Sequence, residues 1–230
     1  MKNKIITIML AATALSLASC DKETEGVTGI TIYPVLELEG ESTIFVDKGT
    51  AFEDPGYIAT LDGEDVSDQV VVNSDINTNT SGIYSISYTI TNSDGFSKNA
   101  SRTVVVLDPS DEVEGVYTVD ANSYRDYSGT VTKYGASFDI LVINKGDYYY
   151  VDDLMGGWYC QRAGYGSKYA MEGYIAIADD GSIELLDSSV AGWGDSADDL
   201  EGTYDFATHT FDIVTYYAGV IEFHFTMTKN

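Results

Sequence analysis

The stretch Gly82-Ile83-Tyr84-Ser85-Ile86-Ser87-Tyr88-Thr89-Ile90 decides the fold class of this chain. Its large apolar and aromatic side chains alternate with Ser and Thr, which is the period-two pattern of a β-strand with one buried face. Similar short runs of Val, Ile, Tyr, Phe and Thr recur along the chain, separated by clusters of Gly, Asp, Asn and Ser. No helical pattern of comparable strength follows the first twenty residues, so the sequence predicts an all-β protein.

Working outward from this strand, we expect an N-terminal β domain over residues 27–108. It contains about seven short strands in about eighty residues, which is the scale of an immunoglobulin-like sandwich. The clearest expected strands cover residues 31–36, 42–46, 70–72, 84–90 and 102–106. The run Val70-Val71-Val72 has the composition of a buried strand. Turns are expected at Pro55-Gly56 and at Asn92-Ser93-Asp94-Gly95.

Three motifs in this region resemble a known family. They are Gly49-Thr50-Ala51-Phe52-Glu53-Asp54-Pro55-Gly56, then Gly82 to Tyr88, then Asp94-Gly95 with the closing Arg102-Thr103-Val104-Val105-Val106. Together they resemble the bacterial Ig-like surface domains, which also occur in some pesticidal crystal proteins. The spacing at Asp94-Gly95 is shorter than the family pattern. The resemblance implies a spacer or adhesive module. Asp54 resembles a ligand residue, but we favour the interpretation that its carboxylate caps the turn beside Pro55.

The beginning of the chain carries a targeting signal. Lys2 and Lys4 precede an apolar run, and Leu17-Ala18-Ser19-Cys20 follows it. This is the pattern of a secretory signal peptide over residues 1–19. The last four residues resemble a bacterial lipobox, which implies that Cys20 is lipidated and holds the protein on a membrane through acyl chains such as palmitate. The alternative is an ordinary signal peptide with an unrelated Cys.

Residues 20–26 form a short acid-rich tether. This tether resembles the surface-export signal of Bacteroidota lipoproteins, which predicts a lipid-anchored protein on the outer face of the outer membrane. A plain solvated tether is the alternative, since charged segments with few apolar residues stay disordered.

Composition limits the partners. The chain has 37 acidic and 12 basic residues, a formal net charge of −25 at pH 7. Such a surface repels nucleic acid and anionic lipid head groups, so we expect no nucleic-acid partner. Acidity of this kind also raises the question of calcium, although it more often serves solubility and resistance to non-specific contact. With Cys20 lipidated, Cys160 has no disulfide partner and is interpreted as a small core residue.

Residues 109–114 form a short Pro-containing acidic linker, and a second β domain follows over residues 115–230. Its expected strands cover residues 115–119, 130–134, 137–143, 148–151, 174–178, 183–186, 202–206, 210–217 and 220–227. Tight turns at 144–147, 179–182 and 207–209 join neighbouring strands, which predicts an antiparallel meander. That many strands close into a barrel or form a sandwich, and the sequence leaves these two alternatives open.

Nothing in the sequence has the pattern of a catalytic or metal site. His209 lies in a turn and His224 on the polar face of the last strand, without metal-ligand spacing. The acidic pairs Asp152-Asp153, Asp179-Asp180 and Asp198-Asp199 are interpreted as solvated loop charge, because pairs occur by chance among 37 acids. We therefore expect a non-enzyme with no catalytic residue, no metal and no cofactor.

Two glycine-rich loops stand out because they are dense in aromatic residues. Residues 153–169 carry Trp158, Tyr159, Tyr165 and Tyr169, and residues 191–195 carry Trp193. Aromatic rings can stack on the apolar faces of sugars while nearby Asp, Gln and Arg bond the hydroxyls, so these five residues are candidate ligand-binding residues. Alternatively, the rings close the end of the domain as part of its core.

These features together predict a lipid-anchored cell-surface protein whose C-terminal domain captures a polysaccharide. The two-domain plan resembles the small accessory lipoproteins of Bacteroidota, several of which accompany glycan-uptake systems. The alternative is a structural or adhesive protein whose C-terminal domain binds a neighbouring surface protein.

Overall fold

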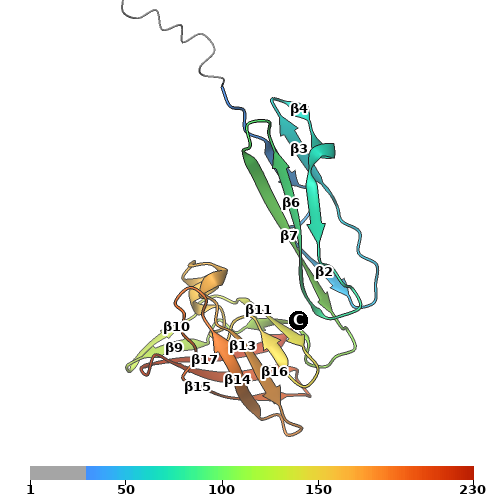
Figure 1. The fold of residues 1–230 in the computed structure, drawn as a ribbon. Coiled ribbons are helices and arrows are strands. Elements are labelled where there is room, and N and C mark those ends of the chain that lie inside the picture. Colours follow the sequence, from blue (N-terminus) through green and yellow to red (C-terminus); the bar gives the residue numbers. More distant parts are fainter. Residues whose placement is uncertain (1–29) are drawn as a thin grey trace, which may run out of the picture.

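The computed structural model describes residues 30–230 and is almost entirely β (Figure 1). The predicted signal peptide, Cys20 and the acidic tether lie outside the described residues. The all-β prediction is confirmed, with an Ig-like sandwich followed by one large antiparallel sheet.

The N-terminal sandwich consists of two sheets. The first has the order β1 (Val35–Leu38), β3 (Tyr57–Leu61), β4 (Glu64–Asp65), and the second has the order β2 (Thr43–Asp47), β7 (Ser97–Leu107), β6 (Gly82–Thr91), β5 (Val71–Ser74). A 3₁₀ turn, η1 (Ser67–Gln69), precedes β5. The alternating residues of β6 behave as predicted, since Ile86, Tyr88 and Ile90 are buried between the sheets with Leu36 and Val104.

The prediction of a buried strand at residues 70–72 is wrong for Val71 and Val72, while Val70 is partly buried against the sandwich core. Val71 and Val72 are exposed on β5, which pairs only with β6 and forms the edge of its sheet. An apolar run indicates burial only where both faces of the strand are covered. Val71 and Val72 point to opposite faces of β5, and both faces are exposed.

Asp54 has a structural role in the sandwich. Its Oδ1 accepts the backbone N–H of Gly56 at 3.2 Å, so the turn-capping interpretation is confirmed. The same carboxylate also forms an ion pair with the fully buried Arg102 and accepts the hydroxyl of Tyr88 at 2.6 Å. Arg102 donates further hydrogen bonds to the carbonyl oxygens of Glu39 and Gly56. The family motif therefore supplies one buried polar network.

The C-terminal sheet curls around its own core. Its strands are β8 (Gly115–Val119), β9 (Tyr124–Tyr127), β10 (Thr130–Lys133), β11 (Asp139–Asn144), β12 (Tyr149–Val151), β13 (Glu172–Ile177), β14 (Ile183–Ser189), β15 (Asp199–Asp205), β16 (Thr210–Tyr217) and β17 (Ile221–Lys229). The order is β10-β9-β17-β8-β11-β12-β13-β14, and β16 and β15 extend from the other edge of β17. A bridge between Ser182 and Thr203 joins the β14 end to β15, so the sheet curls on itself as in a barrel.

Strand β17 carries the pattern predicted for it. Phe223, Phe225 and Met227 are buried in the core, while Glu222 and His224 face the other side. Its first half pairs with β9 and its last residues pair with β8, so β9 and β10 form a hairpin that branches off the curled sheet. Strand β9 was not among the strands expected from the sequence.

The two parts of the chain meet through a small apolar cluster and a hydrogen-bonded connection. Val105 of β7 packs with Leu141 and Ile143 of β11. The buried carboxylate of Glu114 accepts the backbone N–H of Asp108 at 2.8 Å and that of Asn144 at 3.1 Å. The short acidic connection is therefore fixed at both ends by hydrogen bonds.

Candidate aromatic binding site

The larger aromatic loop lies between β12 and β13 and contains two short helical turns. These are η2, a π-helical turn (Trp158–Arg162), and η3, a 3₁₀ turn (Ser167–Tyr169). Gly156 and Gly157 enter η2 with φ of 57° and 82°, which favours glycine. A Cβ on Gly156 would lie 2.9 Å from the ring of Phe225, and one on Gly157 would lie 2.9 Å from the side chain of Phe138. The glycines therefore let the loop approach the core closely.

Asp153 fixes both ends of this loop. Its carboxylate accepts the backbone N–H groups of Met155 at 2.9 Å and Gly157 at 3.2 Å before η2, and that of Met171 at 3.1 Å after η3. Asp153 is buried, and burial raises its pKa to about 6 against the opposing effect of these three hydrogen bonds. The prediction of solvated loop charge is thus wrong for Asp153, which anchors the loop.

Four of the five predicted site residues come together in one aromatic cluster, with Tyr217 of β16 beside them. The ring centroid of Trp193 lies 4.8 Å from that of Tyr159, 4.9 Å from that of Tyr169 and 6.2 Å from that of Tyr217. Tyr165 lies 6.0 Å from Tyr159 and 5.6 Å from Tyr169. Tyr165 is 54% exposed and Trp193 is 41% exposed, so the cluster presents aromatic surface to solvent.

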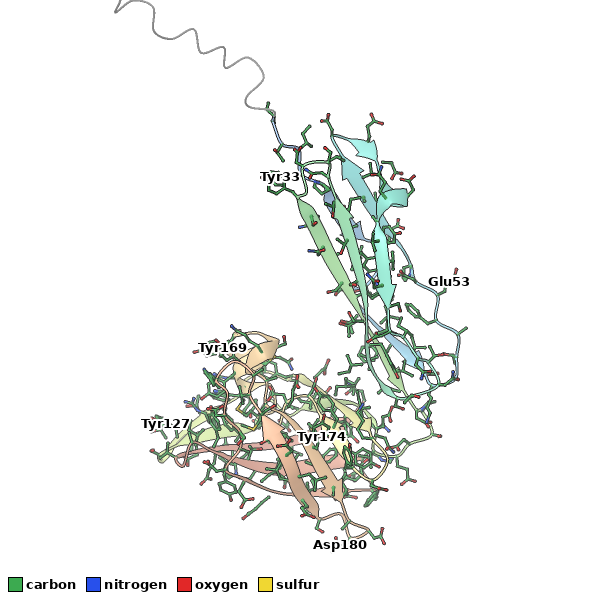
Figure 2. The ribbon with its side chains drawn as sticks, in the orientation of Figure 1. Tyr33, Glu53, Tyr127, Tyr169, Tyr174 and Asp180 are labelled. Atoms are coloured by element: carbon green, nitrogen blue, oxygen red, sulfur yellow. The ribbon has the colours of Figure 1, made fainter. Side chains whose placement is uncertain are left out.

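Direct contacts hold the two loops together. The backbone N–H of Gly192 donates to the carbonyl oxygen of Lys168 at 2.6 Å. A Cβ on Gly192 would lie 2.5 Å from ring carbons of Tyr169, so only glycine admits this approach. Figure 2 shows Tyr169 at the tip of the loop, above the curled sheet. The exposed rings therefore belong to a fixed arrangement.

Polar groups border the cluster. The hydroxyl of Tyr217 donates to Oδ2 of Asp195 at 2.6 Å, and burial together with this bond raises the pKa of Tyr217. The Nζ of Lys168 lies 5.0 Å from the ring centroid of Tyr169. Gln161 is exposed at the end of η2 and donates from Nε2 to the carbonyl oxygen of Asp139 at 2.8 Å.

Trp158, the fifth predicted site residue, is separate from this surface. It is only 3% exposed and belongs to the core of the C-terminal sheet. Its ring lies 5.0 Å from that of Tyr134 and 6.2 Å from that of Phe223. The guanidinium carbons of Arg162 and Arg125 lie 4.1 Å and 4.7 Å from its ring. Trp158 therefore fixes the start of η2 in the core and does not contribute to the exposed aromatic surface.

The sequence analysis missed Tyr217 and Arg125 as neighbours of the site. Tyr217 ends a strand whose alternation marks it as a core residue, and nothing nearby in the sequence indicates that it borders Trp193. Arg125 lies on the unpredicted strand β9. Only the pairing of β9 with β17, which places Arg125 opposite Phe223, brings it to the loop.

The other candidate residues have local roles. Asp180 accepts hydrogen bonds from Ser182 in an exposed turn, and His224 stacks on Tyr124 at 4.5 Å and contacts Glu222. Cys160 is half-buried, and burial raises the pKa of its thiol. Within residues 30–230, no group of three or more His, Cys, Asp or Glu side chains is placed to hold a metal ion. In the same range, no helix has the length and apolarity that crossing a bilayer requires.

Comparison with known proteins agrees with this architecture. A model of the family "Bacterial surface protein, Ig-like domain" matches residues 36–106, and a model of a C-terminal domain family matches residues 106–229. Residues 36–106 thus form an Ig-like domain of this family, and a distinct C-terminal β domain follows it.

The crystal structure of the lipoprotein BT2262 from Bacteroides thetaiotaomicron is 38% identical to this chain, with a TM-score of 0.74. The match covers 86% of this chain and 100% of that chain. The chain therefore belongs to the BT2262-like lipoprotein family.

A second solved structure is much less similar to this chain. The structure of CBM51-2 in complex with GlcNAc and INT domains from Clostridium perfringens ZmpB is 16% identical, with a TM-score of 0.28. That match covers 85% of this chain and 43% of that chain. No curated protein matches the chain.

Proposed function

We propose that this protein is a non-catalytic, lipid-anchored protein of the outer-membrane surface that captures a polysaccharide for an uptake system. The observation that carries the proposal is the partly exposed cluster formed by Tyr159, Tyr165, Tyr169 and Trp193. Membership of the BT2262-like lipoproteins supports the lipid anchor, for which Cys20 is the candidate residue.

The chemistry of the cluster suits a sugar ligand. The faces of pyranose rings carry C–H groups that stack on aromatic rings, and their edges carry hydroxyls that need hydrogen-bond partners. Trp193 and Tyr165 supply exposed ring surface, while Asp195 and Lys168 supply polar groups at the margin. Because the rings contact one another and the loops are fixed by Asp153 and Gly192, little ordering of side chains accompanies binding.

A polysaccharide array with purified protein tests the binding proposal. We expect Trp193→Ala to weaken binding of the polysaccharide that the wild type selects by about 1–3 kcal/mol, the range for loss of a central aromatic contact. Tyr174→Ala is the matched control, because Tyr174 is 37% exposed but lies on β13 beside Tyr148 and Tyr150 (Figure 2). Wild-type protein that binds no polysaccharide would contradict capture and favour the protein-partner alternative.

Cell fractionation tests the proposed lipid anchor and surface location independently of ligand binding. We expect Cys20→Ala to lose lipid labelling and membrane retention, since acyl chains on this residue are the proposed anchor. Replacing Asp21, Glu23 and Glu25 with Ala should keep the lipid but reduce protease accessibility on intact cells. A Cys20→Ala protein that stays in the outer-membrane fraction would overturn the anchor.

A further inference from the structure

Two arginines contact the indole of Trp158, next to the aromatic cluster. Arg162 comes from the end of η2 and Arg125 from β9, and their guanidinium carbons lie 4.1 Å and 4.7 Å from the indole ring centroid. Arg125 also lies 5.7 Å from the ring of Tyr127. Cation–π contact of this kind fixes the orientation of a guanidinium without consuming its N–H groups.

Neither arginine is paired with a carboxylate within residues 30–230. The ion pairs of this range join Lys48 to Asp108, Arg102 to Asp54 and His224 to Glu222. The Nε–H of Arg125 is buried and has no acceptor. Arg162 donates its Nε–H to the carbonyl oxygen of Tyr134 at 2.9 Å, which leaves its two Nη groups free for another partner.

This lack of partners is notable in so acidic a chain. With 37 acidic residues against 12 basic ones, a carboxylate is the most available neighbour for any surface arginine. A guanidinium fork binds a carboxylate or a sulfate through two parallel hydrogen bonds, so a neighbouring Asp or Glu would occupy it. Arg125 and Arg162 instead lie against the indole of Trp158, which leaves their Nη groups without a carboxylate partner.

The position of the pair connects it to the proposed site. Arg125 lies opposite Phe223 in the pairing of β9 with β17. The ring of Phe223 lies 5.8 Å from that of Tyr159, a member of the aromatic cluster, and 6.2 Å from that of Trp158. Phe223 is fully buried, so it links the two groups through the core. At the surface, the exposed Arg162 lies three residues after Tyr159 in the same turn η2, where a sugar chain bound to the cluster meets it.

We infer that the captured polysaccharide is acidic and that Arg125 and Arg162 bind its carboxylate or sulfate groups. This inference rests on the proposed function and names the class of its ligand. The overall negative charge of the protein opposes a densely charged polymer, but at physiological ionic strength repulsion is screened beyond about 8 Å. The best ligand is thus a polysaccharide in which charged and neutral sugars alternate, so that its charged groups contact the protein only at the two arginines.

Affinity electrophoresis tests the inference with three immobilised probes: polygalacturonate for carboxylates, κ-carrageenan for sulfate on every second sugar, and galactan as a neutral polymer. We expect wild-type protein to bind an acidic probe, and Arg125→Gln and Arg162→Gln each to weaken that binding about tenfold, the size of one lost charge-assisted contact. Lys133→Gln is the control, because Lys133 lies on the neighbouring strand β10 and contacts Asn122 instead of an aromatic ring. It should bind like the wild type.

The outcomes distinguish a failure of the acidic-ligand inference from a failure of the proposed polysaccharide capture. Binding to galactan alone, or arginine variants that bind the acidic probes normally, would overturn the acidic ligand and leave polysaccharide capture standing. Binding to none of the three probes would overturn the acidic ligand, and the wider array would then decide about capture. Because the arginine variants could lose stability, wild-type binding is also measured from about 0.05 to about 0.5 M NaCl. We expect it to weaken with salt, and salt-independent binding would contradict the inference.

Discussion

At the scale of single residues, the network of Asp54, Tyr88 and Arg102 explains why the Ig-like motif has these residue types. Arg102 is fully buried, and a buried charge is tolerated only when it is paired and hydrogen-bonded. Asp54 supplies the counter-charge, and the carbonyl oxygens of Glu39 and Gly56 accept further N–H groups. The motif residues therefore serve the stability of the sandwich.

We expect Asp54→Ala to lower the free energy of unfolding of the sandwich by about 3 kcal/mol, because it leaves Arg102 charged and unpaired in the core. Urea denaturation measures the change. Asp94→Ala, in the exposed turn between β6 and β7, is the control and should alter stability by less than about 0.5 kcal/mol. A loss below about 1 kcal/mol for Asp54→Ala would show that water replaces the carboxylate.

Trp158 and Trp193 have the same side chain in different surroundings, so we expect their replacement by Ala to have different effects on stability and on binding. Trp158→Ala removes a core ring and the surface on which two arginines rest, and we expect a loss of about 3–5 kcal/mol in unfolding free energy. Trp193→Ala, at 41% exposure, should cost clearly less stability while weakening ligand binding. Thermal unfolding of both variants separates the roles, and equal destabilisation would contradict them.

At the scale of elements, the sequence predicts a strand well where its apolar and polar residues alternate and its apolar face packs against a complete core. Strand β17 and the hairpin turns around Asn144, Asp179 and Ala207 are confirmed, because each depends on local patterning and turn chemistry. Strand β9 escapes prediction because Tyr-Arg-Asp-Tyr has no apolar alternation. Its Arg125 occupies a position opposite the buried Phe223, which only the pairing with β17 shows.

At the candidate site, the aromatic loop likewise has features that depend on tertiary packing and could not be predicted from the sequence. Its residue types could be recognised from the sequence, and four of the five predicted site residues do lie together. The separation of Trp158 from Tyr159 could not be recognised, because neighbouring residues of the π-helical turn face the core and the surface by tertiary packing. The anchoring role of Asp153 likewise depends on Met171, which lies eighteen residues further along the chain.

The carboxylates at the start of this loop make stability depend on pH. Burial, and then the charges of Asp153 and Glu172, raise the pKa of Asp152 to about 7, above its ordinary value near 3.8. A raised carboxyl pKa means that the folded state holds its proton more tightly than the unfolded state, so stability falls as pH rises from about 4 to about 7. We expect Asp152→Asn to flatten this fall and to gain on the order of 2 kcal/mol at pH 8. Urea denaturation across pH checks both, and an unchanged profile would contradict the assignment.

At the scale of the whole molecule, the sandwich and the curled sheet have separate apolar cores, joined by the small cluster around Val105. We therefore propose that residues 27–108 and 113–230 each fold when expressed alone. Circular dichroism and thermal unfolding of the two fragments test this. An unfolded, aggregated C-terminal fragment would refute the proposed boundary.

The connection between these parts determines how the aromatic cluster is held relative to the sandwich. Glu114 is the central residue of this connection, because its buried carboxylate accepts one N–H from Asp108 and one from Asn144. We expect Glu114→Ala to leave both N–H groups without an acceptor, at about 1–3 kcal/mol each, and to loosen the connection while both cores stay folded. Small-angle X-ray scattering should then show a broader distribution of interatomic distances. Glu112→Ala is the matched control, since Glu112 lies two residues away in the same connection but is exposed. Identical scattering from Glu114→Ala and wild type would mean that the packing of Val105 against Leu141 and Ile143 alone holds the two parts in place.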